Sequence, residues 1–242
     1  MHIFSIHDDN FRRQIEFNIL QKFLKEVKGK KALDIACGKG IITNEFSKQF
    51  SEMYGIDYSK SEIEYAKKAY PHIKFTAGDA HNLPYPNDYF DVVFSNCSLE
   101  HFKNDKKALK ETIRVLKKGG IFATTTEAEP EIINKKINEE RKELHTIYNF
   151  YTVESLSKKL PGMNIVDSEY YLSGLSLRVF MFITWIGKMV TKSHLALFLW
   201  LFNPAVGGFL HKLLFPIIVI VSSKKSNTYK NSIGVAIKAI KK

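Results

Sequence analysis

Two glycines and an aspartate near the start of the chain have the types and spacing to bind a nucleoside-bearing ligand. Gly38 and Gly40 follow an apolar run at 32–36, and glycine lets a backbone turn tightly and approach a ligand that a Cβ would block. Asp57 comes nineteen residues after Gly38 and ends a second strand-like run. Nucleotide-binding α/β units place an acid against ribose hydroxyls at a spacing of about 20 residues. The pattern therefore predicts group-transfer chemistry with a bound nucleoside cofactor.

Two ligand classes fit such a glycine turn, a dinucleotide and S-adenosylmethionine. A dinucleotide site requires a third Gly or Ala for close helix packing, whereas Thr43 occupies that position here. Asp34 lies in the strand that leads into the turn. A carboxylate there would repel a pyrophosphate but can pair with the ammonium group of a methionine moiety. The sequence therefore favours S-adenosylmethionine over a dinucleotide.

Strands and helices alternate along the chain, which indicates a parallel, doubly wound sheet. Strands are expected at 31–36, 52–57, 73–77, 90–95, 121–126, 164–171 and 233–239, and helices at 11–27, 41–50, 59–70, 106–116 and within 130–160. A turn is expected at 118–120, and the last strand is expected to pair antiparallel with 164–171. The prediction is an α/β fold with a mostly parallel, Rossmann-like sheet of seven strands and an apolar helical insertion before the last strand.

Several motifs together resemble a known family. They are Leu33–Gly40, Gly55–Asp57, Ala77–Ala80, Phe90–Ser95 and Leu116–Gly120, and they occur in the order and spacing of class I S-adenosylmethionine-dependent methyltransferases. Two further motifs, 82–85 and 99–101, resemble the group that contains the ubiquinone/menaquinone and sterol methyltransferases. The resemblance covers about residues 10–171 and the final strand. It departs from the family pattern at Ala36, where many members have glycine.

The resemblance implies a set of cofactor-binding residues: Asp34, Ala36, Gly38, Gly40, Asp57, Tyr58, Asp79, Ala80 and Ser95. Asp34 is expected near the amino group of S-adenosylmethionine, Asp57 at the ribose hydroxyls and Asp79 at the adenine amino group. The Ala80 backbone is expected beside the adenine ring and Ser95 near the methionine portion. For Asp57 and Asp79 the alternative interpretation is an acid that only caps a turn.

Glu100 and His101 are the candidate catalytic residues because they follow the fourth strand, where the transferable methyl group should point. Methyl transfer is an in-line displacement that needs little beyond positioning. A hydroxyl acceptor also benefits from a general base, and a neutral histidine suits that role near pH 7. The alternative is that His101 packs structurally or orients the substrate. Arg12 and Arg13 could reach the methionine carboxylate or lie on a solvated helix face.

No metal is assigned, because the remaining histidines lack the spacing of metal ligands. The two cysteines, Cys37 and Cys97, both fall at strand ends, and we expect reduced thiols that fill small buried spaces rather than a catalytic thiol. The first thirteen residues mix His, Asp and Arg, so no secretory signal is expected. These features predict a cytoplasmic protein.

The positive charge is concentrated in the C-terminal third. Glu169 is the last acidic residue, and ten basic residues follow it, so residues 1–169 contribute only +1 of the net charge of +11. Such asymmetry indicates an anionic partner, namely phospholipid, a diphosphate-bearing substrate or nucleic acid. Solubility alone is the other interpretation. The basic residues interleave with Phe, Leu and Ile rather than lining a polar groove, so no nucleic-acid partner is expected.

Residues 172–231 are strongly apolar and far longer than a hairpin connection requires. We expect them to form a separate unit inserted into a methyltransferase domain that consists of residues 1–171 and 232–242. Within them, 177–192 has the pattern of a basic amphipathic helix that lies in a membrane interface. The longest charge-free stretch, 193–211, contains a proline, whereas a bilayer span needs about 20 apolar residues. Peripheral contact with an anionic membrane surface is therefore favoured over a buried cap and over a true span.

Together these observations predict methyl transfer from S-adenosylmethionine to an oxygen or carbon of a lipophilic or lipid-linked small molecule. If the strand at 164–171 runs parallel to the sheet, the insertion leaves the fold beside the active site. A soluble small-molecule methyltransferase without membrane contact is the nearest alternative. An RNA methyltransferase and a non-catalytic cofactor-binding subunit are the others.

Overall fold

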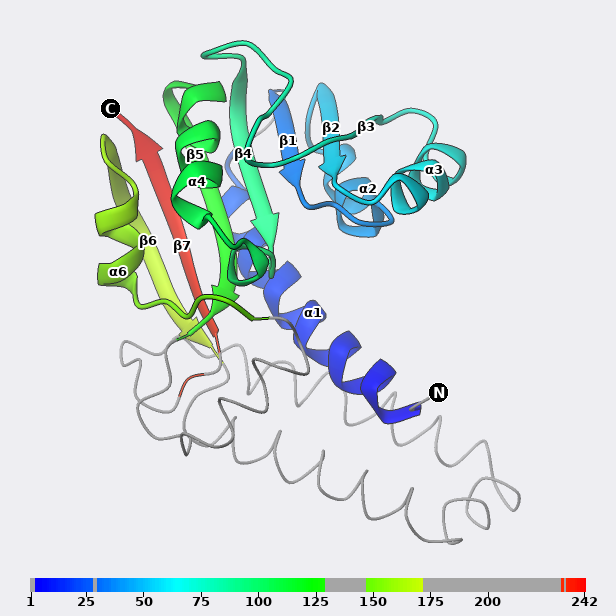
Figure 1. Cartoon of the computed structure of the whole chain (residues 1–242), viewed down its shortest axis with the longest axis horizontal. Helices are drawn as coiled ribbons and strands as arrows, with labels where there is room; N and C mark the ends of the chain where they lie inside the picture. Colours follow the sequence, from blue (N-terminus) through cyan, green and yellow to red (C-terminus); the bar gives the residue numbers. More distant parts are fainter. Residues whose placement is uncertain (1–2, 28–29, 129–146, 172–231, 233) are drawn as a thin grey trace, which may run out of the picture.

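The protein is built around one seven-stranded sheet with helices on both faces (Figure 1). This computed structural model describes residues 3–27, 30–128, 147–171, 232 and 234–242. The strands lie in the order β3-β2-β1-β4-β5-β7-β6, so the chain starts near the middle of the sheet and winds first to one edge and then to the other. In open α/β sheets, ligands bind where the strand order reverses, outside the carboxyl ends of the strands.

The strands are mostly parallel, as the sequence predicts. They are β1 (Lys31–Ile35), β2 (Glu52–Asp57), β3 (Lys74–Ala77), β4 (Phe90–Asn96), β5 (Leu116–Glu127), β6 (Met163–Tyr171) and β7 (Gly234–Lys241). Pairing is parallel from β3 through β5, and β7 is antiparallel to both of its neighbours. Strand β6 therefore runs parallel to β5, and its end at Tyr171 lies at the same edge of the sheet as the ends of β1 to β5.

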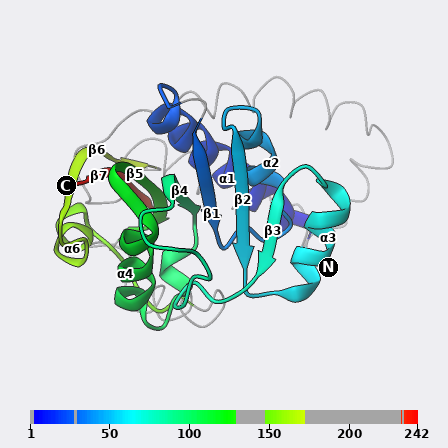
Figure 2. The same ribbon diagram turned by 90° about the horizontal axis from the view of Figure 1, so that it is seen from above.

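The helices form two layers, one on each face of the sheet (Figure 2). They are α1 (Ile3–Leu24), α2 (Ile41–Ser47), α3 (Lys60–Ala69), α4 (Asp105–Val115) and α6 (Val153–Lys159), with a 3-10 turn η1 (Leu99–His101). Helices α1, α2 and α3 share one buried cluster with the sheet, and α4 and α6 share the other. Side-chain caps begin three of them: Ser59 at α3, Asn104 at α4 and Thr152 at α6.

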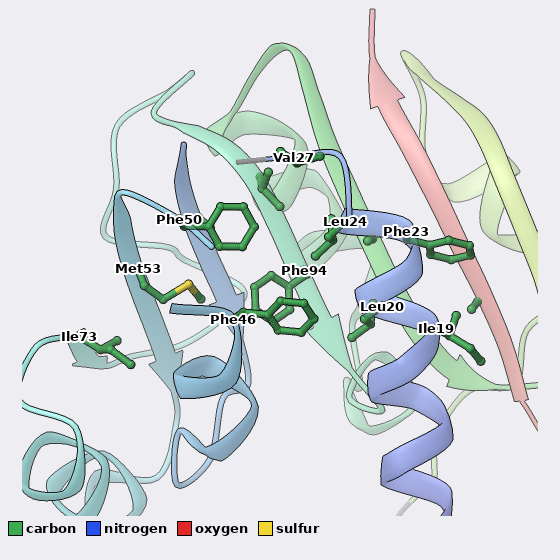
Figure 3. Close-up of a cluster of buried hydrophobic side chains, with 14 of the residues drawn as sticks. Ile19, Leu20, Phe23, Leu24, Val27, Phe46, Phe50, Met53, Ile73 and Phe94 are labelled. Carbon is green, nitrogen blue, oxygen red and sulfur yellow. The ribbon is translucent and has the colours of Figure 1, made fainter. Parts of the chain in front are cut away.

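Helix α1 is held by an apolar stripe that faces the sheet (Figure 3). Ile15, Ile19 and Phe23 recur at helical spacing and are buried. They belong to one cluster with Phe46 from α2 and Phe94 from β4, whose ring centroids lie 4.9 Å apart. The helix starts at Ile3, eight residues before its predicted start, and ends at Leu24. This packing fixes α1 over the central strands.

Strand β5 is longer than predicted. The expected turn at 118–120 lies inside it, because the pairing with β4 shifts register between Phe90 and Val92. Such a bulge absorbs an irregular stretch without ending the strand. Gly119 adopts a φ of 71°, which glycine accepts without strain.

The predicted insertion at 172–231 lies outside the described residues, and so does the helical region predicted before 147. The last part of that region is described, and it is helical only in α6. Among the helices that the structure describes, none combines the length and the apolar character needed to cross a membrane.

Candidate active site

The carboxyl ends of the parallel strands bring together the residues that the motifs predict. The glycine turn follows β1, Asp57 ends β2, Asp79 follows β3, and Ser95 lies near the end of β4. Strands β1 and β4 are neighbours although fifty-four residues lie between the end of β1 and the start of β4, because β2 and β3 turn to the other side. The site therefore lies at the reversal of strand order, where this fold class binds ligands.

The glycine turn is closed by the carboxylate of Asp57. The backbone N–H of Gly38 donates to its Oδ2 at 2.8 Å, and the backbone N–H of Ser59 donates to its Oδ1 at 2.9 Å. These two bonds fix the carboxylate between the turn and the start of α3. Each oxygen retains a second lone pair, so the carboxylate can still accept hydrogen bonds from a ligand diol.

Gly38 and Gly40 are needed for different reasons. Both have positive φ, 51° and 74°. A Cβ at Gly38 would meet no heavy atom within 4 Å, whereas one at Gly40 would lie 2.5 Å from the Phe75 ring. Open space above a backbone in the left-handed region fits close approach by a ligand such as S-adenosylmethionine. Gly40 has a packing reason to be glycine, and its approach to a ligand remains a prediction.

Ala36 occupies a left-handed conformation with φ 58°. An L-residue with a Cβ is strained there by roughly 1–2 kcal/mol relative to the right-handed region. This explains physically why glycine suits the position, and it shows that alanine still permits the turn. The backbone of the turn continues normally, since the N–H of Cys37 donates to the Ile56 carbonyl at 3.1 Å.

Asp34 is the most deeply buried acid of the cofactor-binding set, with 2 % of its surface exposed. Its Oδ2 accepts a 2.7 Å hydrogen bond from the hydroxyl of Thr43. Burial raises the pKa of Asp34 to about 7, the Thr43 bond lowers it, and the nearby Asp57 charge raises it further. Burial and the same two carboxylates also raise the pKa of the Cys37 thiol. Cys37 is therefore a neutral, partly buried thiol, in keeping with a space-filling role.

Asp79 begins a tight turn after β3. Its Oδ1 accepts from the backbone N–H of His81 at 2.9 Å and lies 2.6 Å from the ring Nδ1 of the same histidine. The bond from the backbone N–H of His81 contributes most to a pKa of Asp79 below its usual range. Ala80 is half-buried between them and packs against the apolar cluster under α4. The acid is thus ionised and oriented at the edge of the sheet.

Ser95 and Tyr58 occupy opposite environments. Ser95 is buried, and its hydroxyl pairs with that of Thr124 across β4 and β5 at 2.9 Å. Its side chain therefore links two strands of the sheet, while its backbone lies near the carboxyl end of β4. Tyr58 follows Asp57 and is 84 % exposed, which leaves its ring available to cover a bound ligand. Arg13 is exposed, and the side chain of Arg12 lies outside the described part of the structure.

The two candidate catalytic residues point in opposite directions from η1. Glu100 is fully buried, and its carboxylate accepts from the hydroxyl of Thr126 at 2.7 Å and from the thiol of Cys97 at 2.9 Å. His101 is exposed. The structure thus separates the pair into an inward carboxylate that supports the turn and an outward imidazole that can meet a substrate.

The segment after residue 146 holds η1 in place. The backbone N–H groups of Tyr148 and Asn149 both donate to the carbonyl of Glu100, at 2.7 and 3.2 Å. The Asn149 side chain donates to the Phe102 carbonyl at 2.8 Å, and the buried Tyr151 hydroxyl donates to Asp105 at 2.7 Å. These bonds tie the turn that carries His101 to a distant part of the chain.

A buried polar network beside this turn escaped the sequence interpretation. Glu16 on α1 is fully buried and accepts from the Tyr171 hydroxyl at 2.9 Å and from the Asn96 amide at 3.2 Å. Cys97, Glu100 and Glu127 each have one atom of a type that can coordinate a metal ion, and these three atoms lie within 4.8 Å of one another. The only local signal was a glutamate next to the apolar stripe of α1, which does not reveal a partner in β6.

Comparison with known proteins agrees with the geometry. Residues 33–124, from β1 into β5, match the family model of a methyltransferase domain. Residues 33–124 therefore resemble a methyltransferase domain, and the sheet has the Rossmann-like fold of class I methyltransferases. This similarity and the fold imply S-adenosylmethionine as the cofactor. The chain is 34 % identical to an uncharacterized methyltransferase of Bacillus subtilis, YcgJ, over 106 residues, which make up 42 % of each chain.

A second group of relatives carries a more specific name. A demethylmenaquinone methyltransferase of a Geobacillus strain is 31 % identical over 133 residues, covering 51 % of this chain and 57 % of that protein. Across these matches, the chain spans about half the length of the curated relatives. These relatives therefore bear on about half of the chain.

Solved structures share the whole fold at low sequence identity. A S-adenosylmethionine-dependent methyltransferase from Mesorhizobium loti has a TM-score of 0.63 and 17 % identity, covering 94 % of this chain and 98 % of its own. The [4+2]-cyclase SpnF has a TM-score of 0.62 and 22 % identity, covering 93 % of this chain and 79 % of its own. The fold therefore extends beyond the residues that the family model matches.

Proposed function

We propose that this protein transfers a methyl group from S-adenosylmethionine to an oxygen or carbon of a lipophilic small molecule. The observation that carries the proposal is the Asp57 carboxylate, held by the N–H groups of Gly38 and Ser59 beside an open backbone position. A fixed carboxylate next to a glycine turn is suited to a ribose diol. Asp34 lies one strand away, where a buried carboxylate suits an ammonium group.

When bound, S-adenosylmethionine supplies a methyl group on a positively charged sulfur. Asp34, Asp57 and Asp79 would hold its amino, ribose and adenine groups. The chain's part in the chemistry is to orient the acceptor in line with that methyl group and to exclude water. His101 is the residue we assign to accept the acceptor's proton, because it is exposed at the carboxyl edge and a neutral imidazole can act as a general base.

The relatives support a lipophilic acceptor of the quinone class. Several are named demethylmenaquinone methyltransferases. The apolar, basic sequence of 172–231 follows β6, whose end lies at the cofactor edge. We propose that this segment contacts an anionic membrane surface from the cytoplasmic side and admits the acceptor from it. Isoprenoid and lipid-linked glycan acceptors are also lipophilic, and they fit the same proposal.

The test is a methyl-transfer assay with labelled S-adenosylmethionine. The full chain is incubated with demethylmenaquinone, and in parallel with a bacterial lipid extract and with total RNA, and the labelled products are identified by mass spectrometry. We expect label in a lipid product and none in the Asp57→Ala variant. Label confined to RNA, or to a water-soluble product, would contradict the lipophilic acceptor and support one of the alternatives.

Methyl transfer itself has to be measured, because a [4+2]-cyclase shares this fold. Cofactor binding without any labelled product would favour a non-catalytic cofactor-binding subunit. Membrane contact is tested separately by flotation of the full chain with phosphatidylglycerol vesicles, with phosphatidylcholine vesicles as the control. We expect flotation only with the anionic lipid, and a protein that stays at the bottom of both gradients contradicts the membrane proposal.

A further inference from the structure

His81 lies two residues beyond Asp79 and contacts it twice. Its backbone N–H donates to Asp79 Oδ1 at 2.9 Å, and its ring Nδ1 lies 2.6 Å from the same oxygen. An ionised carboxylate only accepts hydrogen bonds, so the proton of a neutral imidazole is on Nδ1. The backbone N–H of Asn82 also donates to the Asp79 carbonyl at 3.0 Å, which closes the turn. One histidine thus occupies one oxygen of the acid from two directions.

This arrangement decides which way the Asp79 carboxylate faces. Oδ1 is turned back onto the chain by His81, so Oδ2 is the oxygen presented outward, and the Asp79 side chain is 52 % exposed. The contacts with His81 also hold the pKa of Asp79 below its usual range. The acid is therefore an ionised acceptor with one oriented oxygen.

The other ring nitrogen of His81 has no evident structural use. Nε2 is buried and makes no hydrogen bond within the part of the chain that the structure describes. The ring instead meets Phe102 in a T-shaped contact, with centroids 5.6 Å apart. Burying a polar atom without a hydrogen-bond partner is unfavourable, because the atom loses its hydration. A leucine would pack against Phe102 without that cost, so packing alone does not account for a histidine here.

We propose that His81 is a positioning residue for nucleobase recognition: its Nδ1–H holds Asp79 so that Oδ2 accepts a hydrogen bond from the amino group of a 6-aminopurine. The inference rests on the proposed function, because Asp79 is expected at the adenine of the cofactor. His81 thereby orients Asp79 and gives the site its preference for a purine that carries an amino group.

The test compares two variants and two ligands. In His81→Asn the side-chain amide nitrogen occupies the place of Nδ1 and nothing replaces Nε2, whereas His81→Leu keeps the packing on Phe102 and removes the donor. Calorimetry measures the affinity of each variant for S-adenosylhomocysteine and for its analogue whose purine lacks the 6-amino group. The analogue also reports whether the pocket is folded.

We expect His81→Leu to weaken S-adenosylhomocysteine binding by about tenfold, the loss of one oriented hydrogen bond to a charged group, and to leave the analogue unchanged. His81→Asn should restore affinity to within about twofold of the wild type. Equal weakening of both ligands, an unchanged affinity in His81→Leu, or a failure of His81→Asn to restore binding would overturn the inference alone. A wild-type protein that binds neither ligand would instead refute the proposed function.

Discussion

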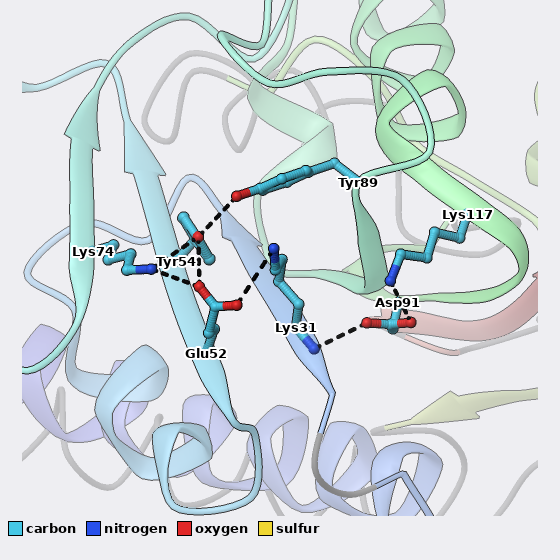
Figure 4. Close-up of polar contacts among 7 residues, drawn as sticks. All are labelled: Lys31, Glu52, Tyr54, Lys74, Tyr89, Asp91 and Lys117. Atoms are coloured by element: carbon cyan, nitrogen blue, oxygen red, sulfur yellow. Dashed lines mark hydrogen bonds and ion pairs between the residues drawn. The ribbon is translucent and has the colours of Figure 1, made fainter.

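The two edges of the sheet hold their carboxylates in different ways. At the amino edge, where the parallel strands begin, carboxylates face lysines (Figure 4). Glu52 lies 2.6 Å from the ammonium group of Lys74 and 3.4 Å from that of Lys31, and Asp91 lies 2.9 Å from that of Lys117. The bond from Lys74 is the largest cause that lowers the pKa of Glu52 to about 2. Charges at this edge are matched by opposite charges.

At the carboxyl edge, the acids proposed for the active site accept hydrogen bonds from neutral donors. Asp57 accepts from two backbone N–H groups, Asp34 from a threonine hydroxyl, and Glu100 from a hydroxyl and a thiol. Neutral donors orient a carboxylate without cancelling its charge. The same sheet therefore has one edge whose carboxylates form ion pairs with lysines, and one edge whose candidate-site acids are held in fixed directions by neutral donors.

The difference between the two edges is tested most strongly by removing, in separate variants, the acid at each end of β2. We expect Asp57→Ala to weaken S-adenosylhomocysteine binding by about 100-fold or more, since each hydrogen bond to a charged group contributes about 1.5–3 kcal/mol. Glu52→Ala at the other end of the strand should leave the affinity unchanged. Calorimetry with both variants decides, and equal affinities of Asp57→Ala and the wild type would refute the site.

The outward imidazole at the carboxyl edge should affect chemistry rather than binding. His101→Ala is expected to lower kcat by about 100-fold, the lower range for loss of a general base, with an unchanged affinity for S-adenosylhomocysteine. His72→Ala, on the exposed turn before β3, is the control. An unchanged kcat in His101→Ala would show that the acceptor needs no base from this residue.

The inward partner on the same turn should affect stability. Glu100→Ala leaves the buried Thr126 hydroxyl and the Cys97 thiol without their acceptor, and we expect a loss of about 2–4 kcal/mol in the free energy of unfolding. Glu154→Ala breaks the exposed pair with Lys158 and should change the free energy of unfolding much less, because solvent screens an exposed ion pair. Denaturant titration of both variants measures the difference, and similar losses would contradict the distinction between the two environments.

Asp34 should make cofactor binding depend on pH. Because burial raises its pKa from 3.8 to about 7, its contribution to the stability of the unliganded protein is full below about pH 4 and is lost as the pH rises through 7. A ligand ammonium favours the ionised form, so affinity for S-adenosylhomocysteine should rise by about tenfold from pH 6 to 8. Asp34→Asn should give a flat profile, and a pH dependence that persists in this variant assigns the effect to another group.

The smallest expected effect concerns the strained turn. Ala36→Gly should raise the free energy of unfolding by about 1 kcal/mol, because glycine accepts the left-handed conformation that alanine resists. Ala32→Gly, in a strand with ordinary backbone angles, is the control and should destabilise the protein. Thermal unfolding of the two variants tests whether the glycine turn stores strain, and a destabilised Ala36→Gly would show that it does not.

Local patterns in the chain predict the alternation of strands and helices and the order of the motifs at the strand ends. Apolar period and glycine spacing are local, so the turn at Gly38, the acid at Asp57 and the α/β class could be predicted from near neighbours in the chain. The antiparallel pairing of the last strand with 164–171 was predicted and is confirmed, and the parallel direction of β6, which entered the sequence analysis only as a condition, holds in the structure. These predictions depend on the pattern within one strand or on spacing across one strand–helix–strand unit.

Contacts between side chains from distant segments depend on how the elements pack in three dimensions. Glu100 and His101 are adjacent in sequence, yet Glu100 is buried and His101 is exposed. The segment at 147–151 holds the turn that carries both residues. Glu16 and Tyr171 are 155 residues apart and share a hydrogen bond. Such contacts depend on the order of the strands in the sheet, which brings β4, β5 and β6 together under α1, and no local pattern carries that information.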